Sequence, residues 1–141
     1  MIIRIPQREE EDCAICAVAM VMGPPYDYDR VRADSQKYSK VSPDGKFSPW
    51  WETYLRDEGF DARHCYFDGL YALPNYGGSV TALLGMDIPS LRVSHIVAVD
   101  ENGVVDPANG APAHVELGDY VLSRLADGVI FHAEFLAVKR A

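Results

Sequence analysis

The stretch that decides the fold of this chain is residues 7–22, QREEEDCAICAVAMVM, in which a charged run gives way abruptly to an apolar one. Residues 13–22 are apolar on almost every face, which is typical of a helix buried on all sides. Asp12 stands directly before them, in the position of a helix N-cap. A Gly-Pro-Pro sequence at 23–25 ends the helix. We therefore expect a central, buried helix from Cys13 to Met22.

The segments around this helix are shorter and more polar. Residues 2–5 form an apolar strand or extended arm before it, and helical character returns at 27–38 and 49–58. The sequence Ser-Pro-Asp-Gly at 42–45 predicts a turn between those two helices. Ser48 is expected to cap the second of them, with Pro49 at its first position.

From residue 61 onward the pattern changes from helical to alternating. We expect strands at 61–67, 79–86, 93–99, 104–106 and 129–138, a hairpin turn at 100–103 and a short helix at 117–125. Helices followed by an antiparallel sheet make an α+β fold. The sequence has no repeat and no linker, so residues 1–141 are expected to form one domain.

The composition limits the function. The 141 residues can close a core without disulfide or metal support, and neither a metal nor another cofactor is expected. With 13 Lys+Arg against 21 Asp+Glu, the net charge of −8 and the lack of a basic cluster argue against a nucleic-acid partner. Three cysteines make no disulfide framework, and no apolar run is long enough to span a membrane. The chain does not open with the charged and then apolar segments of a signal peptide. We therefore expect a cytoplasmic protein without a membrane span.

Cys13 is the first candidate for chemistry. At the first turn of a helix, unpaired backbone N–H groups and the positive end of the helix dipole favour a thiolate and a developing oxyanion. The alternative is a small, buried packing residue, which most free cysteines are. Gln7 lies on the arm that enters the helix. Its amide is a donor of the kind that lines an oxyanion hole, and the chain is long enough to fold it back beside Cys13.

His95 and Asp106 are expected to meet through the hairpin. A loop over residues 100–103 sets Val99 opposite Val104, which places Asp106 diagonal to His95 on one face of the sheet. A tighter turn at 102–103 would keep the face but set Asp106 opposite Val99, too distant from His95, so we predict the wider loop. Diagonal neighbours are about 7–8 Å apart at the backbone, within reach of a carboxylate and an imidazole. An imidazole held by a carboxylate, with its other nitrogen turned to a thiol, is the arrangement that nucleophilic catalysis requires.

These motifs together resemble the C39-type cysteine peptidases of the papain-like superfamily. The matching features are a Gln, an Asp-Cys pair that opens an apolar helix, a His that leads a strand, and an Asp-Pro that ends the next strand. The resemblance implies a papain-like fold with N-terminal helices packed on an antiparallel sheet. It also implies that Cys13 is the nucleophile, His95 the general base and acid, Asp106 the orienting group and Gln7 the oxyanion donor.

Other residues suggest competing sites. Cys13 and Cys16 form a C-x-x-C, the spacing of a redox pair or of half a zinc site, but no second pair of ligands completes it. Cys65 is the third thiol, and alternation along its strand turns His64 to the opposite face. His114 is expected at the surface and His132 on a partly exposed strand face. The aromatic residues expected in the core or on a cleft wall are Trp50, Trp51, Tyr54, Tyr71 and Tyr76.

The sequence thus predicts a cysteine hydrolase acting on a peptide or protein substrate through a thioester. An amidase, deamidase or acyltransferase would use the same intermediate, because either water or an amine can resolve it. A binding or inhibitory protein that keeps the scaffold without turnover is the alternative from another class. The oligomeric state is left open.

Overall fold

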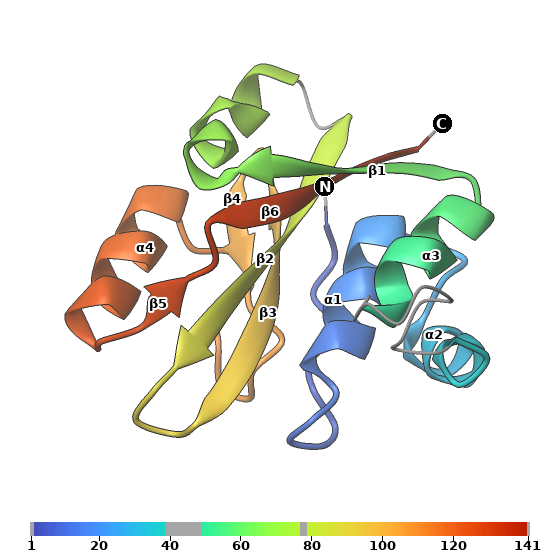
Figure 1. The fold of residues 1–141 in the computed structure, drawn as a ribbon, viewed down its shortest axis with the longest axis horizontal. Coiled ribbons are helices and arrows are strands. Elements are labelled where there is room, and N and C mark those ends of the chain that lie inside the picture. Colours follow the sequence, from blue (N-terminus) through green and yellow to red (C-terminus); the bar gives the residue numbers. More distant parts are fainter. Residues whose placement is uncertain (1, 39–48, 77–78, 141) are drawn as a thin grey trace, which may run out of the picture.

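The computed structural model describes residues 2–38, 49–76 and 79–140. A six-stranded antiparallel sheet has the order β1-β6-β2-β3-β4, and β5 also pairs with β2. The strands are β1 (Phe60–Tyr66), β2 (Val80–Ile88), β3 (Val93–Asp100), β4 (Gly103–Val105), β5 (Ile130–Phe131) and β6 (Glu134–Arg140). Helices cover both faces of the sheet (Figure 1). The α+β class is therefore confirmed.

Three helices lie on one face of the sheet: α1 (Cys13–Met22), α2 (Tyr28–Ser35) and α3 (Trp50–Asp57) (Figure 1). Helix α1 has the predicted bounds, and all its residues from Cys16 onward are buried. Its apolar side chains pack against α2, α3 and the inner residues of the sheet, among them Leu83, Ile96 and Leu136. None of the helices in the described part of the chain is long and apolar enough to cross a lipid bilayer.

The opposite face carries α4 (Leu117–Ala126) and the 3-10 helix η1 (Phe67–Tyr76) (Figure 1). A second core lies beneath them, formed by side chains such as Leu70, Met86, Val97 and Tyr120. The sequence did not predict η1. Its contribution to this core depends on two buried leucines, which is too short a pattern to indicate a helix from the sequence alone.

The β3–β4 hairpin has the predicted register, with Val99 opposite Val104. The ladder continues to a pair between Asp100 and Gly103, so the turn itself contains only two residues. Gly103 has a φ of 127°, and a Cβ there would overlap the carbonyl of Val115. Only glycine fits this position. Strand β4 ends at Val105, one residue earlier than expected, and Asp106 follows it.

The last predicted strand, 129–138, is wrong as a single element, because it is broken into β5 and β6. The two pieces pair with different parts of β2, and His132 lies in the gap between them. There the His132 N–H donates to the Gly85 carbonyl at 3.0 Å, and its ring covers Gly85 so closely that a Cβ would lie 2.5 Å from Nδ1. His132 is therefore not on a regular strand face, although its side chain is about half exposed and contacts Asp87.

The N-terminal residues form an extended arm that is bonded to the hairpin turn and to the segment after β4. The Ile2 N–H donates to the Asp100 carboxylate at 2.8 Å. The Arg4 guanidinium donates to the main-chain carbonyls of Asp106 and Ala108. These bonds hold the segment after β4 against the arm that leads into α1.

The remaining helix ends differ slightly from the expectation. Helix α2 ends at Ser35 rather than at residue 38, and the Asp27 side chain caps its start by accepting the Arg30 N–H. Helix α3 begins at Trp50, with Pro49 in the N-cap position. The predicted turn at 42–45 and the predicted cap at Ser48 lie outside the described residues.

Candidate active site

Cys13 is the first residue of α1, and its thiol is half-buried. Asp12 occupies the N-cap position, but its carboxylate accepts no hydrogen bond from the helix. The first N–H groups of a helix have no acceptor within the helix. Those next to Cys13 are therefore not capped by Asp12. Such a helix end attracts negative charge.

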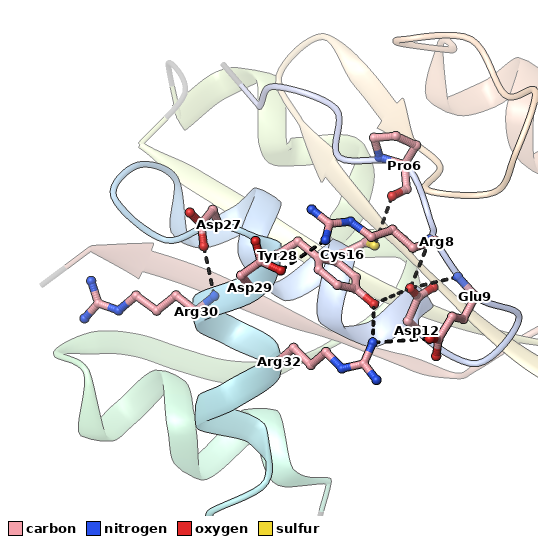
Figure 2. A network of polar contacts seen from close by, with 10 residues as sticks. All are labelled: Pro6, Arg8, Glu9, Asp12, Cys16, Asp27, Tyr28, Asp29, Arg30 and Arg32. Carbon is pink, nitrogen blue, oxygen red and sulfur yellow. Dashed lines mark hydrogen bonds and ion pairs between the residues drawn. The ribbon is translucent and has the colours of Figure 1, made fainter.

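The Asp12 carboxylate instead holds the loop before the helix (Figure 2). Its Oδ2 accepts the N–H groups of Arg8 and Glu9, each at 3.0 Å, and the Tyr28 hydroxyl at 2.7 Å. Burial opposes its ionisation, but the hydrogen bonds from Tyr28, Arg8 and Glu9 keep the pKa of Asp12 below its usual value. Asp12 thus occupies the predicted N-cap position, but its carboxylate stabilises the loop of residues 7–12 instead of bonding to the helix.

Two arginines, Arg8 and Arg32, contact acidic side chains of this loop and of α2 (Figure 2). The Arg8 guanidinium lies 4.0 Å from the centre of the Tyr28 ring and 3.0 Å from the Asp29 carboxylate. Arg32 donates to the Tyr28 hydroxyl at 3.0 Å and lies 3.4 Å from the Glu9 carboxylate. Within the acidic run before Cys13, Glu9 is therefore paired with a cation, Arg32, whereas Arg8 pairs with an acid of α2.

His95, near the start of β3, joins the thiol to a carboxylate. Its Nε2 lies 2.7 Å from Oδ1 of Asp106, and the two side chains are 10% and 11% exposed. The Cys13 side chain is the second group that acts on the imidazole, and both residues line the same cavity. Burial alone would lower the pKa of His95, but Asp106 and Cys13 outweigh it and raise the pKa to about 9. The imidazolium form is therefore stabilised between the two partners.

Asp106 is held on both of its oxygens. Oδ1 accepts the Ala108 N–H at 2.8 Å in addition to the contact with His95. Oδ2 accepts the hydroxyl of Tyr120, a residue of α4, at 2.8 Å. Burial opposes ionisation, but the bonds from His95, Ala108 and Tyr120 lower the pKa of Asp106. The sequence does not predict this contact of Tyr120, because nothing in the pattern of α4 shows which core residue its hydroxyl meets.

Gln7 lies beside this segment through its main chain. Its N–H donates to the Pro107 carbonyl at 2.7 Å. Its side-chain amide donates to the carbonyls of Glu9 and Glu10, at 3.1 and 3.3 Å. Within the described residues, no hydrogen bond joins this amide to Cys13. Gln7 therefore lies in the loop before Cys13, and its side-chain N–H groups are bonded to carbonyls of that loop.

A cavity of about 550 Å³ opens beside Cys13 and His95. Its walls are mostly apolar, and Trp51, Leu83, Ile96 and Leu136 contribute to them. A second cavity, of about 670 Å³, also borders His95 and extends past Gln7 toward Leu91. The two cavities share Ser94 and His95, so the imidazole lies where they adjoin.

The aromatic residues divide between core and surface. Trp50 and Tyr54 are buried in the core, and Trp51 lies on the wall of the cavity beside Cys13. Tyr71 and Tyr76, expected in the core or on a cleft wall, are 53% and 57% exposed and lie outside the core. Tyr76 borders a separate cavity on the α4 face, away from the Cys13 thiol.

Two further histidines pair with acids outside the Cys13–His95 pair. His114, expected at the surface, is only 22% exposed, and its Nε2 lies 3.1 Å from the buried Asp100 carboxylate. His64 lies on the cavity wall with its Nε2 2.8 Å from Glu52. The neighbouring Cys65 packs toward the opposite core, so the predicted opposition of His64 and Cys65 is confirmed.

All three cysteines are free thiols. Cys16 is fully buried, its Sγ lies 3.6 Å from the Pro6 carbonyl, and burial raises its pKa to about 12. It behaves as a packing residue. Among residues 2–38, 49–76 and 79–140, no three His, Cys, Asp or Glu side chains are placed to hold a metal ion.

Taken together, a thiol lies beside an imidazole that is hydrogen-bonded to a carboxylate, at an uncapped helix end on the border of an apolar cavity. An imidazole in this position can remove a proton from the thiol and later return it to a leaving group. The open N–H groups of the helix can stabilise an oxyanion. These are the elements of acyl transfer through a thioester.

Comparisons with known proteins agree on the fold. No protein-family model matches the sequence, and neither does any curated protein sequence. The peptidase domain of Streptococcus ComA, a bifunctional ABC transporter involved in quorum sensing, matches with a TM-score of 0.66 and 16% identity over 100% of both chains. A double-glycine-motif protease from an AMS/PCAT transporter, solved with the leader peptide, matches with a TM-score of 0.56 and 18% identity, over 100% of this chain and 93% of the other.

Proposed function

Because the chain has the papain-like fold of C39 peptidase domains, we propose that it is a cysteine peptidase with Cys13 as its nucleophile. The observation that carries the proposal is the 2.7 Å contact between His95 and Asp106, with the Cys13 thiol beside the same imidazole on the border of one cavity. His95 is the general base and acid in this proposal, and Asp106 orients it. The adjoining cavities offer space for the substrate on both sides of the imidazole.

In the acylation step, His95 holds the proton of the Cys13 thiol, and the thiolate attacks the carbonyl carbon of the scissile amide. A carbon–sulfur bond forms, and the carbonyl electrons move to the oxygen. When the oxyanion collapses, the carbon–nitrogen bond breaks and the imidazolium gives its proton to the leaving amine. A thioester on Cys13 remains.

The oxyanion would lie at the N-terminus of α1, beside the Cys13 N–H. Asp12 leaves this end of the helix open because its carboxylate is bonded to the loop and to Tyr28. Gln7 would supply the second donor once its amide turns away from the carbonyls that it now contacts. The loss of one such donor typically slows a reaction by about 100–1,000-fold.

In the deacylation step, water takes the place of the departed amine. His95 removes a proton from the water as its oxygen attacks the thioester carbon, and the thiolate leaves with the electrons of the carbon–sulfur bond. The product acid departs, and the proton remains shared between His95 and Cys13. Asp106 keeps the ring in one orientation through both steps.

The reactivity of Cys13 tests this proposal. We expect iodoacetamide to alkylate Cys13 rapidly near about pH 6, where an ordinary thiol is almost fully protonated. Peptide-resolved mass spectrometry separates Cys13 from Cys65 and from the buried Cys16. The Cys16→Ala variant is the matched control, because it removes a thiol one helical turn away and is expected to leave the Cys13 rate unchanged.

Turnover is tested with a library of peptides from a digested proteome. New peptide termini are expected after incubation with the wild-type chain and with Cys16→Ala, but not with Cys13→Ala. Slow alkylation of all three thiols, together with no cleavage, would overturn the proposal. That outcome would instead indicate a scaffold that binds peptides without cutting them.

A further inference from the structure

We propose that Tyr120 is a positioning residue for the proposed reaction: it fixes the Asp106 carboxylate so that Oδ1 faces His95. The inference rests on the proposed function, because it assigns a role in the same series of groups. Tyr120 does not contact the thiol or the imidazole in the described hydrogen bonds. It acts through Asp106, from a helix on the opposite face of the sheet from α1 (Figure 1).

The contacts of Asp106 divide between its two oxygens. Oδ1 carries His95 at 2.7 Å and the Ala108 N–H at 2.8 Å, whereas Oδ2 carries the Tyr120 hydroxyl at 2.8 Å. A rotation that exchanged the two oxygens would disturb all three bonds. Arg4 holds the same segment, but through the main-chain carbonyl, which does not fix the carboxylate plane. Tyr120 is therefore the side chain that fixes the oxygen facing away from His95.

Packing alone does not require the Tyr120 hydroxyl. The residue is 7% exposed, and its ring belongs to the core between α4 and the sheet, where a phenylalanine ring would fill nearly the same volume. A buried hydroxyl needs a partner, and this one has the carboxylate, with the Met86 sulfur 3.8 Å away. The Tyr120 hydroxyl is therefore explained by its hydrogen bond to Asp106 and not by packing in the core.

The Tyr120 hydroxyl stays protonated over the pH range in which the site would work. Burial and the neighbouring Asp106 charge raise the pKa of Tyr120 far above its ordinary value. The hydroxyl therefore keeps its proton and donates to Oδ2 at neutral and moderately alkaline pH. The same bond helps to keep Asp106 ionised, which the interaction with the His95 imidazolium requires.

The chain contains a matched control. Tyr54, in α3, is 1% exposed, and its hydroxyl donates to Oδ2 of Asp34 at 2.7 Å. Both tyrosines therefore join a buried ring to a carboxylate. Only the carboxylate paired with Tyr120 contacts His95. Tyr54→Phe removes the same kind of bond without touching the proposed catalytic groups.

The test is a double-mutant cycle on the rate of Cys13 alkylation by iodoacetamide at about pH 7. We expect Tyr120→Phe to slow alkylation on the order of tenfold, the effect of one hydrogen bond to a charged group. In the Asp106→Ala background, Tyr120→Phe is expected to have no further effect. Tyr54→Phe is expected to keep the wild-type rate, and thermal melting checks that each variant is folded.

Two results would overturn the inference: a wild-type rate in Tyr120→Phe, or an equal slowing by Tyr120→Phe with and without Asp106. A wild-type Cys13 that reacts no faster than Cys65 would contradict the proposed function instead, so the two failures are distinguishable. NMR of the unsubstituted Tyr120 gives a second measurement. Its slowly exchanging hydroxyl proton should disappear in Asp106→Ala while that of Tyr54 remains, and an unchanged Tyr120 signal would also overturn the inference.

Discussion

Nε2 of His95 lies 2.7 Å from Oδ1 of Asp106, and the β3–β4 hairpin is the reason. The turn reverses the chain so that Val99 pairs with Val104, and Asp106 follows two residues later. The carboxylate then faces a ring that is close to the thiol on its other side. A change in the register of this hairpin would separate the pair.

Removal of the Asp106 charge should shift the pH dependence of Cys13. Asp106 helps to raise the pKa of His95 to about 9, so Asp106→Asn should lower that pKa and the alkaline limit of the thiolate–imidazolium pair. NMR titration of His95 and alkylation rates across the pH range measure both effects. Asp87→Asn, at an exposed carboxylate paired with His132, serves as the control. An unchanged His95 titration in Asp106→Asn would contradict the assignment.

The stability of the folded chain should fall toward alkaline pH. The pKa of His95 rises from 6.5 to about 9 on folding, so His95 binds its proton more tightly in the folded state. Its contribution is complete below about pH 6.5 and is lost as the pH rises through about 9. Asp106 and Asp100 have lowered pKa values, so their contributions are present above about pH 4 and are lost as the pH falls. Urea unfolding at a series of pH values measures this, and a His95→Gln variant with an unchanged alkaline slope would refute the assignment to His95.

Tyr28→Phe should distinguish the role of the loop of residues 7–12 from the reactivity of the Cys13 thiol. The Tyr28 hydroxyl is one of the groups that hold Asp12 and hence the loop carrying Gln7 (Figure 2). We expect a loss of about 1–2 kcal/mol in the free energy of unfolding. Peptide cleavage should slow because the oxyanion donor is less well placed, whereas Cys13 alkylation should keep its rate because His95 and Asp106 are untouched. Equal losses in cleavage and alkylation would show that the loop supports the thiol itself.

Asp100→Ala should weaken the attachment of the N-terminal arm. The carboxylate accepts the Ile2 and Asn102 N–H groups, each at 2.8 Å, and contacts His114 at 3.1 Å. Its removal leaves buried donors without a partner, for which we expect roughly 2–4 kcal/mol of destabilisation by chemical denaturation. Asp127→Ala, at an exposed helix end, should change the stability by about 0.5 kcal/mol or less. Similar values for the two variants would contradict this role.

Gly85→Ala should displace His132. A Cβ at position 85 would lie 2.5 Å from the ring, so the imidazole must leave its place on the cavity wall. We expect a cost of about 1–3 kcal/mol. The second substitution His132→Ala should remove most of that cost. Gly69→Ala, where the nearest ring atom is at an ordinary 3.5 Å, is the control, and a Gly85→Ala cost that persists without His132 would place the conflict elsewhere.

The parts of the fold that could be predicted depend on neighbours in the sequence. The bounds of α1 follow from an unbroken apolar run, and the register of the hairpin follows from placing residues 100–103 between the paired Val99 and Val104. The contact between His95 and Asp106 could therefore be inferred from the amino-acid sequence alone. Register is strongly specified wherever one face of a strand is buried.

The errors depend on contacts between distant segments. The strand predicted at 129–138 breaks because its two halves pair with different parts of β2, and the alternation within it does not reveal this. His114 has the sequence context of a loop residue, and only the hairpin brings Asp100 to it. Asp12 occupies the predicted N-cap position, but the sequence does not show that its Oδ2 bonds to Tyr28 and to the loop N–H groups rather than to the helix.

The attachment of the N-terminal arm to the hairpin also has a consequence for biosynthesis. Ile2 is bonded to a residue 98 positions later, and Arg4 to one 102 positions later. Because synthesis runs from the N-terminus, the ribosome makes the helix that carries Cys13 well before it makes His95, Asp106 and Tyr120. Until those residues emerge, the nascent chain carries an ordinary thiol. Under the proposed function, the site becomes reactive only after the chain has been made as far as Asp106, which protects the growing polypeptide from its own nucleophile.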